Sequence, residues 1–159
     1  MMDEEFEKYR IEQANAWLSK VRKLVQYEKA MRQAADVQYE MADGLRGIDY
    51  SRDQVATSAT PDAIPNAVIA HEEAGDSLRE IADSAKERIA KAARALDSMD
   101  DPTEAAALTL YFLACRTWEQ VCVSMRYTWD GMMKLRRRAL LHAYDAMPHS
   151  ERDPMEPAI

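Results

Sequence analysis

Two long stretches of the chain carry apolar residues at the spacing of an α-helix. Over about residues 3–46 and again over about residues 66–99, the apolar positions recur every three, four or seven residues, which places them on one face at about 3.5–3.6 residues per turn. The first stripe is Trp17, Val21, Leu24, Met31, Ala34, Met41 and Leu45. The second is Ala67, Ala70, Ala74, Leu78, Ile81, Ala85, Ile89, Ala92, Leu96 and Met99. Each stripe needs a partner helix to cover it.

The segment between these stripes has no period. Gly44 and Gly47 end the first helix, and residues 48–65 are rich in the turn-forming residues Ser, Thr, Asp and Pro. We therefore predict a long antiparallel helical hairpin, coiled-coil-like, over residues 1–99 with a mobile linker at about 48–65. Pairing between copies is the competing arrangement, and we expect a homodimer through the long helices.

After residue 99 the pattern becomes short and punctuated. Asp100, Asp101 and Pro102 break the second helix, and a short helix is predicted over about 103–114. Thr117 starts another short helix, with Glu119 and Gln120 close to the cap in the manner of a capping box. Thr128 caps a third helix that runs to about residue 146, before Pro148. This gives a second domain over 103–147 and a frayed tail over 148–159.

Three short helices with a tight turn between the second and third are the layout of a helix-turn-helix. Their predicted inner faces share an apolar character and comprise Leu108, Tyr111, Phe112, Trp118, Val121, Cys122, Met125, Met132, Leu135, Ala139 and Leu140. The small Cys122 suits the closest approach of two crossing helices. The outer face of the third helix is then Trp129, Asp130, Met133, Lys134, Arg136, Arg137 and Arg138.

Composition narrows the fold class. Of 159 residues, 47% are apolar, which argues against general disorder, and 4 Gly with 6 Pro are too few for the turns of a sandwich or barrel. The class is all-α. No run approaches about 20 apolar residues, and the acidic N-terminus lacks a signal-peptide pattern, so we expect no membrane association and a cytoplasmic location.

The charge is unevenly distributed. The whole chain has a formal charge of −7, and residues 1–102 hold 14 basic and 21 acidic side chains, also −7. Residues 103–147 hold 6 basic and 4 acidic side chains, net +2. Screening limits a charge's reach to about 8–10 Å at ordinary salt, so a locally basic segment of an acidic protein can still meet nucleic acid.

Signals of catalysis are missing from the sequence. The three His residues are scattered, and neighbouring acids such as Glu72 and Glu73 point apart on a helix. There is no Gly-rich phosphate loop and no nucleophile motif. Cys115 and Cys122 lack a second ligand pair for zinc and are expected to be buried free thiols. We expect no enzyme, no catalytic residues, no metal and no cofactor.

The stretch LTLYFLACRTWEQVCVSMRYTWDGMMKLRRRAL, residues 108–140, resembles the C-terminal domain of sigma-factor-like phage transcriptional regulators of the ArpU and RinA type. The matching landmarks are Leu110-Tyr111, Thr117-Trp118-Glu119-Gln120-Val121, Met125, Tyr127-Thr128, Met132, Leu135 and Ala139-Leu140. The resemblance implies a sigma-region-4-like helix-turn-helix behind a helical N-terminal segment. It differs at Arg126, where the family carries Gly, and at Gly131, which weakens a helix by about 1 kcal/mol relative to Ala.

The resemblance implies a phage or prophage transcriptional regulator that binds double-stranded DNA, with RNA polymerase as a further partner. The candidate DNA-binding residues are Thr128, Trp129, Asp130, Met133, Lys134, Arg136, Arg137 and Arg138. The alternative for the basic residues is a solvated helix C-terminus that complements the dipole. Two alternative functions stay open: a phage small terminase subunit that recognises DNA for packaging, and a protein-interaction adaptor that does not bind DNA.

Overall fold

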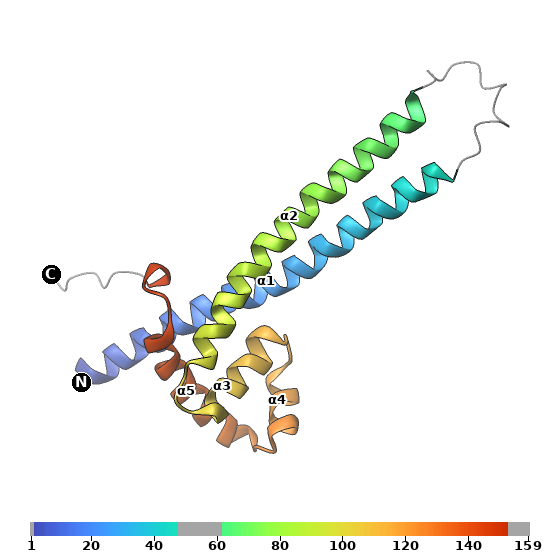
Figure 1. The fold of residues 1–159 in the computed structure, drawn as a ribbon. Helices are drawn as coiled ribbons and strands as arrows, with labels where there is room; N and C mark the ends of the chain where they lie inside the picture. The colour runs from blue at the N-terminus through green and yellow to red at the C-terminus, as the bar shows by residue number, and fades with distance from the viewer. Residues whose placement is uncertain (1, 48–61, 153–159) are drawn as a thin grey trace. The chain divides into compact units, whose positions relative to one another are not determined.

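The computed structural model describes residues 2–47 and 62–152. All regular structure in these ranges is helical, which confirms the all-α class. The elements are α1 (Met2–Arg46), α2 (Ala63–Asp97), α3 (Pro102–Leu108), the π-helical turn η2 (Thr109–Leu113), α4 (Trp118–Met125), α5 (Trp129–Ala146) and the short 3-10 helix η3 (His149–Glu151) (Figure 1). The predicted mobile linker lies mostly outside the described residues.

The chain divides into two compact units. Unit 1 comprises Met1–Gln26 and Glu87–Ile159, and unit 2 comprises Tyr27–Lys86. The sequence placed the boundary near residue 100 instead, between 1–99 and 103–147. The difference arises because Trp17 of α1 and Leu96 of α2 are buried in the same core as Phe112 and Leu140, which joins the ends of both long helices to the short ones.

Unit 1 has two adjoining cores. The first packs α1 and α2 against η2 and α5 through Leu18, Leu96, Phe112, Leu140 and further apolar residues. The second lies under the short helices and comprises Ala107, Trp118, Val121, Cys122, Met132 and Leu135. Every residue of the predicted inner faces is buried except Tyr111 and Met125, which are half-buried. Apolar spacing therefore located this core correctly.

In unit 2, residues 27–46 of α1 and 63–86 of α2 run antiparallel (Figure 1). The order of the contacts shows the direction, because Arg32 pairs with Asp83 whereas Arg46, further along α1, pairs with Glu72. The predicted stripes are wrong in register here. Met41 and Ile81 were expected inside and are 48% and 42% exposed. Small residues occupy the contact line instead: Ala35, Ala42, Gly75 and Ala82.

Three element boundaries also differ from prediction. α2 begins at Ala63, so Pro65 lies in its first turn, where the missing N–H costs nothing. The helix expected over 103–114 changes to a π turn, in which the N–H of Ala114 donates to the carbonyl of Thr109 at 2.9 Å. The predicted frayed tail is ordered as far as Arg152, whose guanidinium donates to the carbonyls of Tyr144 (2.8 Å) and Met147 (3.0 Å). The rest of that tail lies outside the described residues.

Candidate nucleic-acid interface

Local hydrogen bonds fix the starts of α4 and α5. The Thr117 hydroxyl accepts from the backbone N–H of Gln120 (3.2 Å), while the Gln120 side chain accepts from the N–H of Thr117 (3.0 Å), a complete capping box. The Thr128 hydroxyl accepts from the N–H of Gly131 (3.1 Å) and so caps α5. Both helices therefore begin where the sequence predicted.

Arg126 makes the turn between them. Its backbone is left-handed, with φ 59° and ψ 45°, and this residue is the C-cap of α4. The N–H of the next residue, Tyr127, then donates to the carbonyl of Cys122 at 3.0 Å. A left-handed residue at this place usually is Gly, since a side chain strains this conformation. Arg126 therefore adopts the positive φ for which the resembling family carries Gly, although it has a long basic side chain.

Gly131 has a packing reason. A Cβ at this residue would lie 3.0 Å from the Thr128 hydroxyl that caps the helix. A larger side chain at residue 131 would compete with this hydroxyl for the same space. The low helix propensity of Gly131 is therefore offset by the room it leaves for the Thr128 cap of α5.

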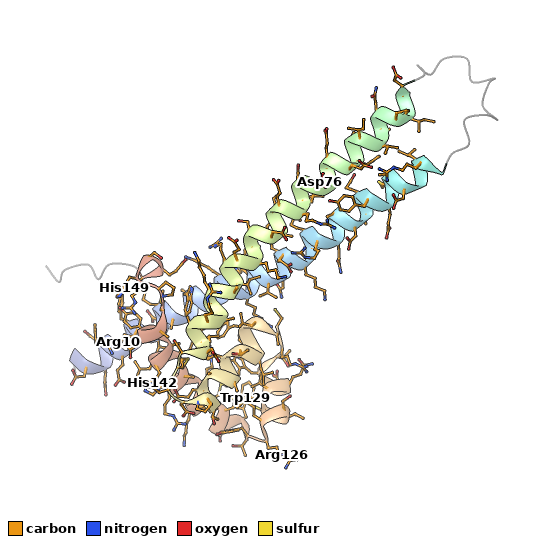
Figure 2. All side chains as sticks on the ribbon, in the orientation of Figure 1. Arg10, Asp76, Arg126, Trp129, His142 and His149 are labelled. Atoms are coloured by element: carbon orange, nitrogen blue, oxygen red, sulfur yellow. The ribbon has the colours of Figure 1, made fainter. Side chains whose placement is uncertain are left out.

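The outer face of α5 carries most of the predicted site. Thr128, Trp129, Asp130, Lys134, Arg137 and Arg138 are exposed, while Met133 and Arg136 are half-buried. Trp129, labelled in Figure 2, is 49% exposed at the start of the helix. Asp130, Lys134 and Arg137 follow one another at intervals of four and three residues, so they form one row. That row faces away from the buried Met132 and Leu135.

The arginines of α5 differ in their surroundings. Arg136 turns back so that its guanidinium carbon lies 5.4 Å from the centre of the Trp118 ring. Arg137 lies 3.8 Å from Glu7 and Arg138 lies 3.7 Å from Glu104, yet their side chains are 66% and 62% exposed. The Arg137–Glu7 pair is exposed on both sides and contributes about 0–1 kcal/mol, whereas the Glu104 side chain in the other pair is 3% exposed. Arg137 can therefore exchange its contact for another anion. Arg138 can do so as well, because His142, at 2.6 Å, remains the nearer partner of Glu104. Arg136 packs on Trp118 and is less available to a ligand.

Two features of the positive surface escaped the sequence interpretation. Among the described residues, Lys134 has no ion-pair partner, which leaves its ammonium group free. Arg126, labelled in Figure 2, is exposed in the turn before α5 and adds a positive charge there, although the sequence identified it only as a departure from Gly. Residues 116–141 hold 6 basic and 2 acidic side chains, a net charge of 6 − 2 = +4.

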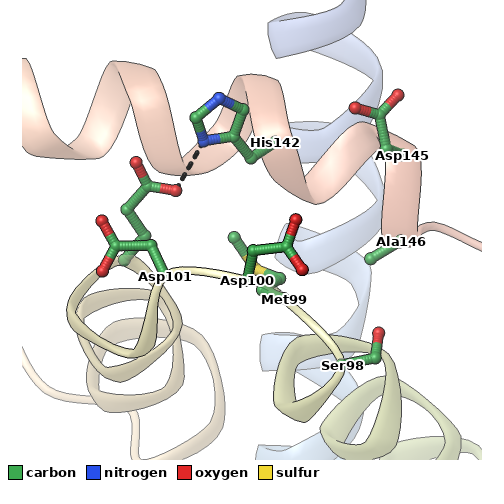
Figure 3. Close-up of a pocket in the computed structure, with 8 residues that line it drawn as sticks. Ser98, Met99, Asp100, Asp101, His142, Asp145 and Ala146 are labelled. Carbon is green, nitrogen blue, oxygen red and sulfur yellow. Dashed lines mark hydrogen bonds and ion pairs between the residues drawn. The ribbon is translucent and has the colours of Figure 1, made fainter.

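An acidic hollow lies beside the C-terminal half of α5, next to Arg138. It has a volume of about 340 Å³ and is lined by Ser98, Met99, Asp100, Asp101, Glu104, His142, Asp145 and Ala146 (Figure 3). Glu104 is only 2% exposed, and its carboxylate is 2.6 Å from Nδ1 of His142. Within residues 2–47 and 62–152, no group of three His, Cys, Asp or Glu side chains has the geometry to hold a metal ion. We assign the Glu104–His142 pair a structural role that ties α3 to α5.

The part of the chain that the structure describes contains no helix long and apolar enough to cross a membrane. Comparison of the chain with models of known families, with curated proteins and with solved structures found no match.

Proposed function

We propose that this chain is a DNA-binding transcriptional regulator of the sigma-like phage type, in which α4, the turn at Arg126 and α5 form a helix-turn-helix. The observation that carries the proposal is the exposure of the basic residues Lys134, Arg137 and Arg138 on α5, together with Arg126 in the turn before this helix. In such a motif the second helix enters the major groove, and its first turns contact base edges.

The residue types fit two kinds of DNA contact, base recognition and phosphate binding. Asp130 and Lys134, in the first turns of α5, have the acceptor and donor that meet cytosine N4 and guanine O6 or N7. Arg137, Arg138 and Arg126 suit phosphates, because flexible exposed cations bind the backbone without reading sequence. Unit 2 contributes 6 basic and 12 acidic residues, net −6, and would repel the duplex, so that the basic row turns toward it.

The test is a titration of the full chain with a labelled duplex of mixed sequence at two salt concentrations. The Lys134→Ala/Arg137→Ala variant should bind more weakly, with the salt slope reduced by about 2. On a duplex without the target sequence Lys134 contacts phosphate as Arg137 does, and each such contact contributes about 0.9. The matched control is Lys86→Ala/Lys91→Ala, which removes two exposed charges from α2. Equal losses in variant and control would refute the proposed face, because the effect would then come from net charge alone.

A protein-docking adaptor is the second candidate, and RNA polymerase would be its partner. It is favoured by three exposed apolar residues around the turn: Val123 (80%), Tyr127 (37%) and Trp129 (49%). The same titration separates the candidates. An absence of duplex binding even at about 50 mM salt, where phosphate contacts are strongest, would favour the adaptor.

A further inference from the structure

The two helices of unit 2 approach each other through small side chains. Their contact line, called the seam here, consists of Ala35 and Ala42 on α1 with Val68, Gly75 and Ala82 on α2. A Cβ on Gly75 would come 2.8 Å from the Tyr39 ring, which shows how close the helices are. Such a seam buries little apolar area, and two helices alone gain little from it.

Polar contacts close one side of the seam. Arg32 donates to Glu28 (2.8 Å) and to Asp83 (3.1 Å), and both hydrogen bonds raise its pKa. The Tyr39 hydroxyl donates to the carboxylate of Asp76 on α2, labelled in Figure 2, at 2.6 Å. Arg46 pairs with Glu72. These residues repeat at helical spacing on each helix, so they form one charged strip per helix, and the two strips meet.

The opposite side of the seam carries a second pair of strips. On α1 the strip is Tyr27, Ala30, Ala34, Val37, Met41 and Leu45, at spacings of 3, 4, 3, 4 and 4. On α2 it is Ala67, Ala70, Ala74, Leu78, Ile81 and Ala85, at spacings of 3, 4, 4, 3 and 4. Neither strip contains Asp, Glu, Lys or Arg. The Gln38–His71 hydrogen bond, 2.7 Å, crosses the seam at their border.

Both apolar strips lie on the same side of the hairpin. On each helix the seam separates the apolar strip from the charged one, and the charged strips meet across the seam, so the apolar strips must also be neighbours. Large side chains remain uncovered on this side: Tyr27 is 47% exposed, Val37 46%, Met41 48% and Ile81 42%. We call this two-helix surface the neutral face.

We propose that the neutral face binds a second copy of itself, so that two hairpins form a four-helix bundle about a twofold axis. A face without charges demands an equally uncharged partner, because an ion buried against it would lose its hydration without compensation. The same face on another copy meets that demand, and a twofold interface pairs a surface with itself. The charged strips then stay in water on the outside of the bundle.

The size of the face agrees with a dimer of moderate affinity. From Tyr27 to Leu45, at about 1.5 Å per residue, it is about 28 Å long, and two helices of about 10 Å make it about 20 Å wide. Each copy would cover about 560 Å², and the pair about 1,100 Å², just above the roughly 1,000 Å² of a specific interface. We therefore expect dissociation at micromolar concentrations rather than a permanent dimer.

The test is the mass of the full chain in solution by sedimentation equilibrium, over about 1 to 100 µM. The expected result is a reversible equilibrium between a monomer of 18.1 kDa and a dimer of twice that mass. Ile81→Glu should weaken the dimer at least tenfold, because it places a carboxylate in the neutral face. The control is Ile69→Glu, since Ile69 is 51% exposed on the same helix but lies outside the apolar strip.

Two results would overturn the proposal: a monomer throughout that range, or equal effects of Ile81→Glu and Ile69→Glu. A closed ring of many copies would also overturn it and would favour the DNA-packaging alternative. If Ile81→Glu loses helicity by circular dichroism, Val37→Lys on α1 is the second variant and must weaken the dimer in its place. The mass does not depend on DNA, so this inference fails separately from the proposed function.

Discussion

Replacing His142 with Ala should destabilise unit 1, because it leaves a buried carboxylate without its best partner. The Glu104 side chain is 3% exposed and lies 2.6 Å from Nδ1 of His142. Once the imidazole is gone, the nearest cation is Arg138 at 3.7 Å.

The size of the effect follows from the exposure of the two partners. A hydrogen bond to a charged group contributes about 1.5–3 kcal/mol to the free energy of unfolding. The His142 side chain is 56% exposed, so solvent weakens the interaction, and we expect a loss of about 2 kcal/mol. Glu104→Met should cost less, below about 1 kcal/mol, since an apolar side chain of similar length removes the charge that must be buried.

Urea unfolding followed by tryptophan fluorescence measures this effect in the right unit, because Trp17, Trp118 and Trp129 all belong to unit 1. His149→Ala is the control, since His149 is exposed and its removal should leave stability unchanged. The full cycle adds His142→Ala in the Glu104→Met background, where the penalty should vanish. The same penalty in both backgrounds would refute the reasoning, because the imidazole would then act without Glu104.

Two further outcomes are expected. Arg126→Gly should raise the free energy of unfolding by about 0.5–1 kcal/mol, since it relieves about 1–2 kcal/mol of left-handed strain and costs about 0.5–1 kcal/mol of chain entropy; any loss of stability in urea would contradict this. In unit 2, the hydrogen bond to Asp76 raises the pKa of Tyr39 above its usual 10. A group with a raised folded pKa stabilises the fold below pH about 10, and this contribution disappears as the pH rises through the folded pKa. The tyrosinate absorbance of Tyr39, identified as the part of the signal that Tyr39→Phe removes, should therefore appear above pH 10. In Asp76→Asn the same absorbance should appear at lower pH. An identical titration of the parent chain and Asp76→Asn would show that the carboxylate has no influence.

Local signals were sufficient for the short helices. Thr117 with Gln120 and Thr128 begin α4 and α5 through hydrogen bonds to residues three positions away, so the information lies within one helical turn. The outward placement of Lys134 and Arg137 follows from the same short range, because the buried Met132 and Leu135 fix which face turns inward. The acidic partners of Arg137 and Arg138, Glu7 and Glu104, lie far away in the chain, so no pattern within a single helix predicted these contacts.

The sequence by itself determined the all-α class, the starts of α4 and α5 and the apolar strips along the two long helices, since these depend on composition and on spacing within a single helix. The tertiary structure alone decided which strip of each helix faces its neighbour. In unit 2 the strips containing Met41 and Ile81 lie outside, whereas the small residues Ala35, Ala42 and Gly75 form the seam. Periodicity marks an apolar strip but not its partner, and closeness of approach between two helices is a property of both together.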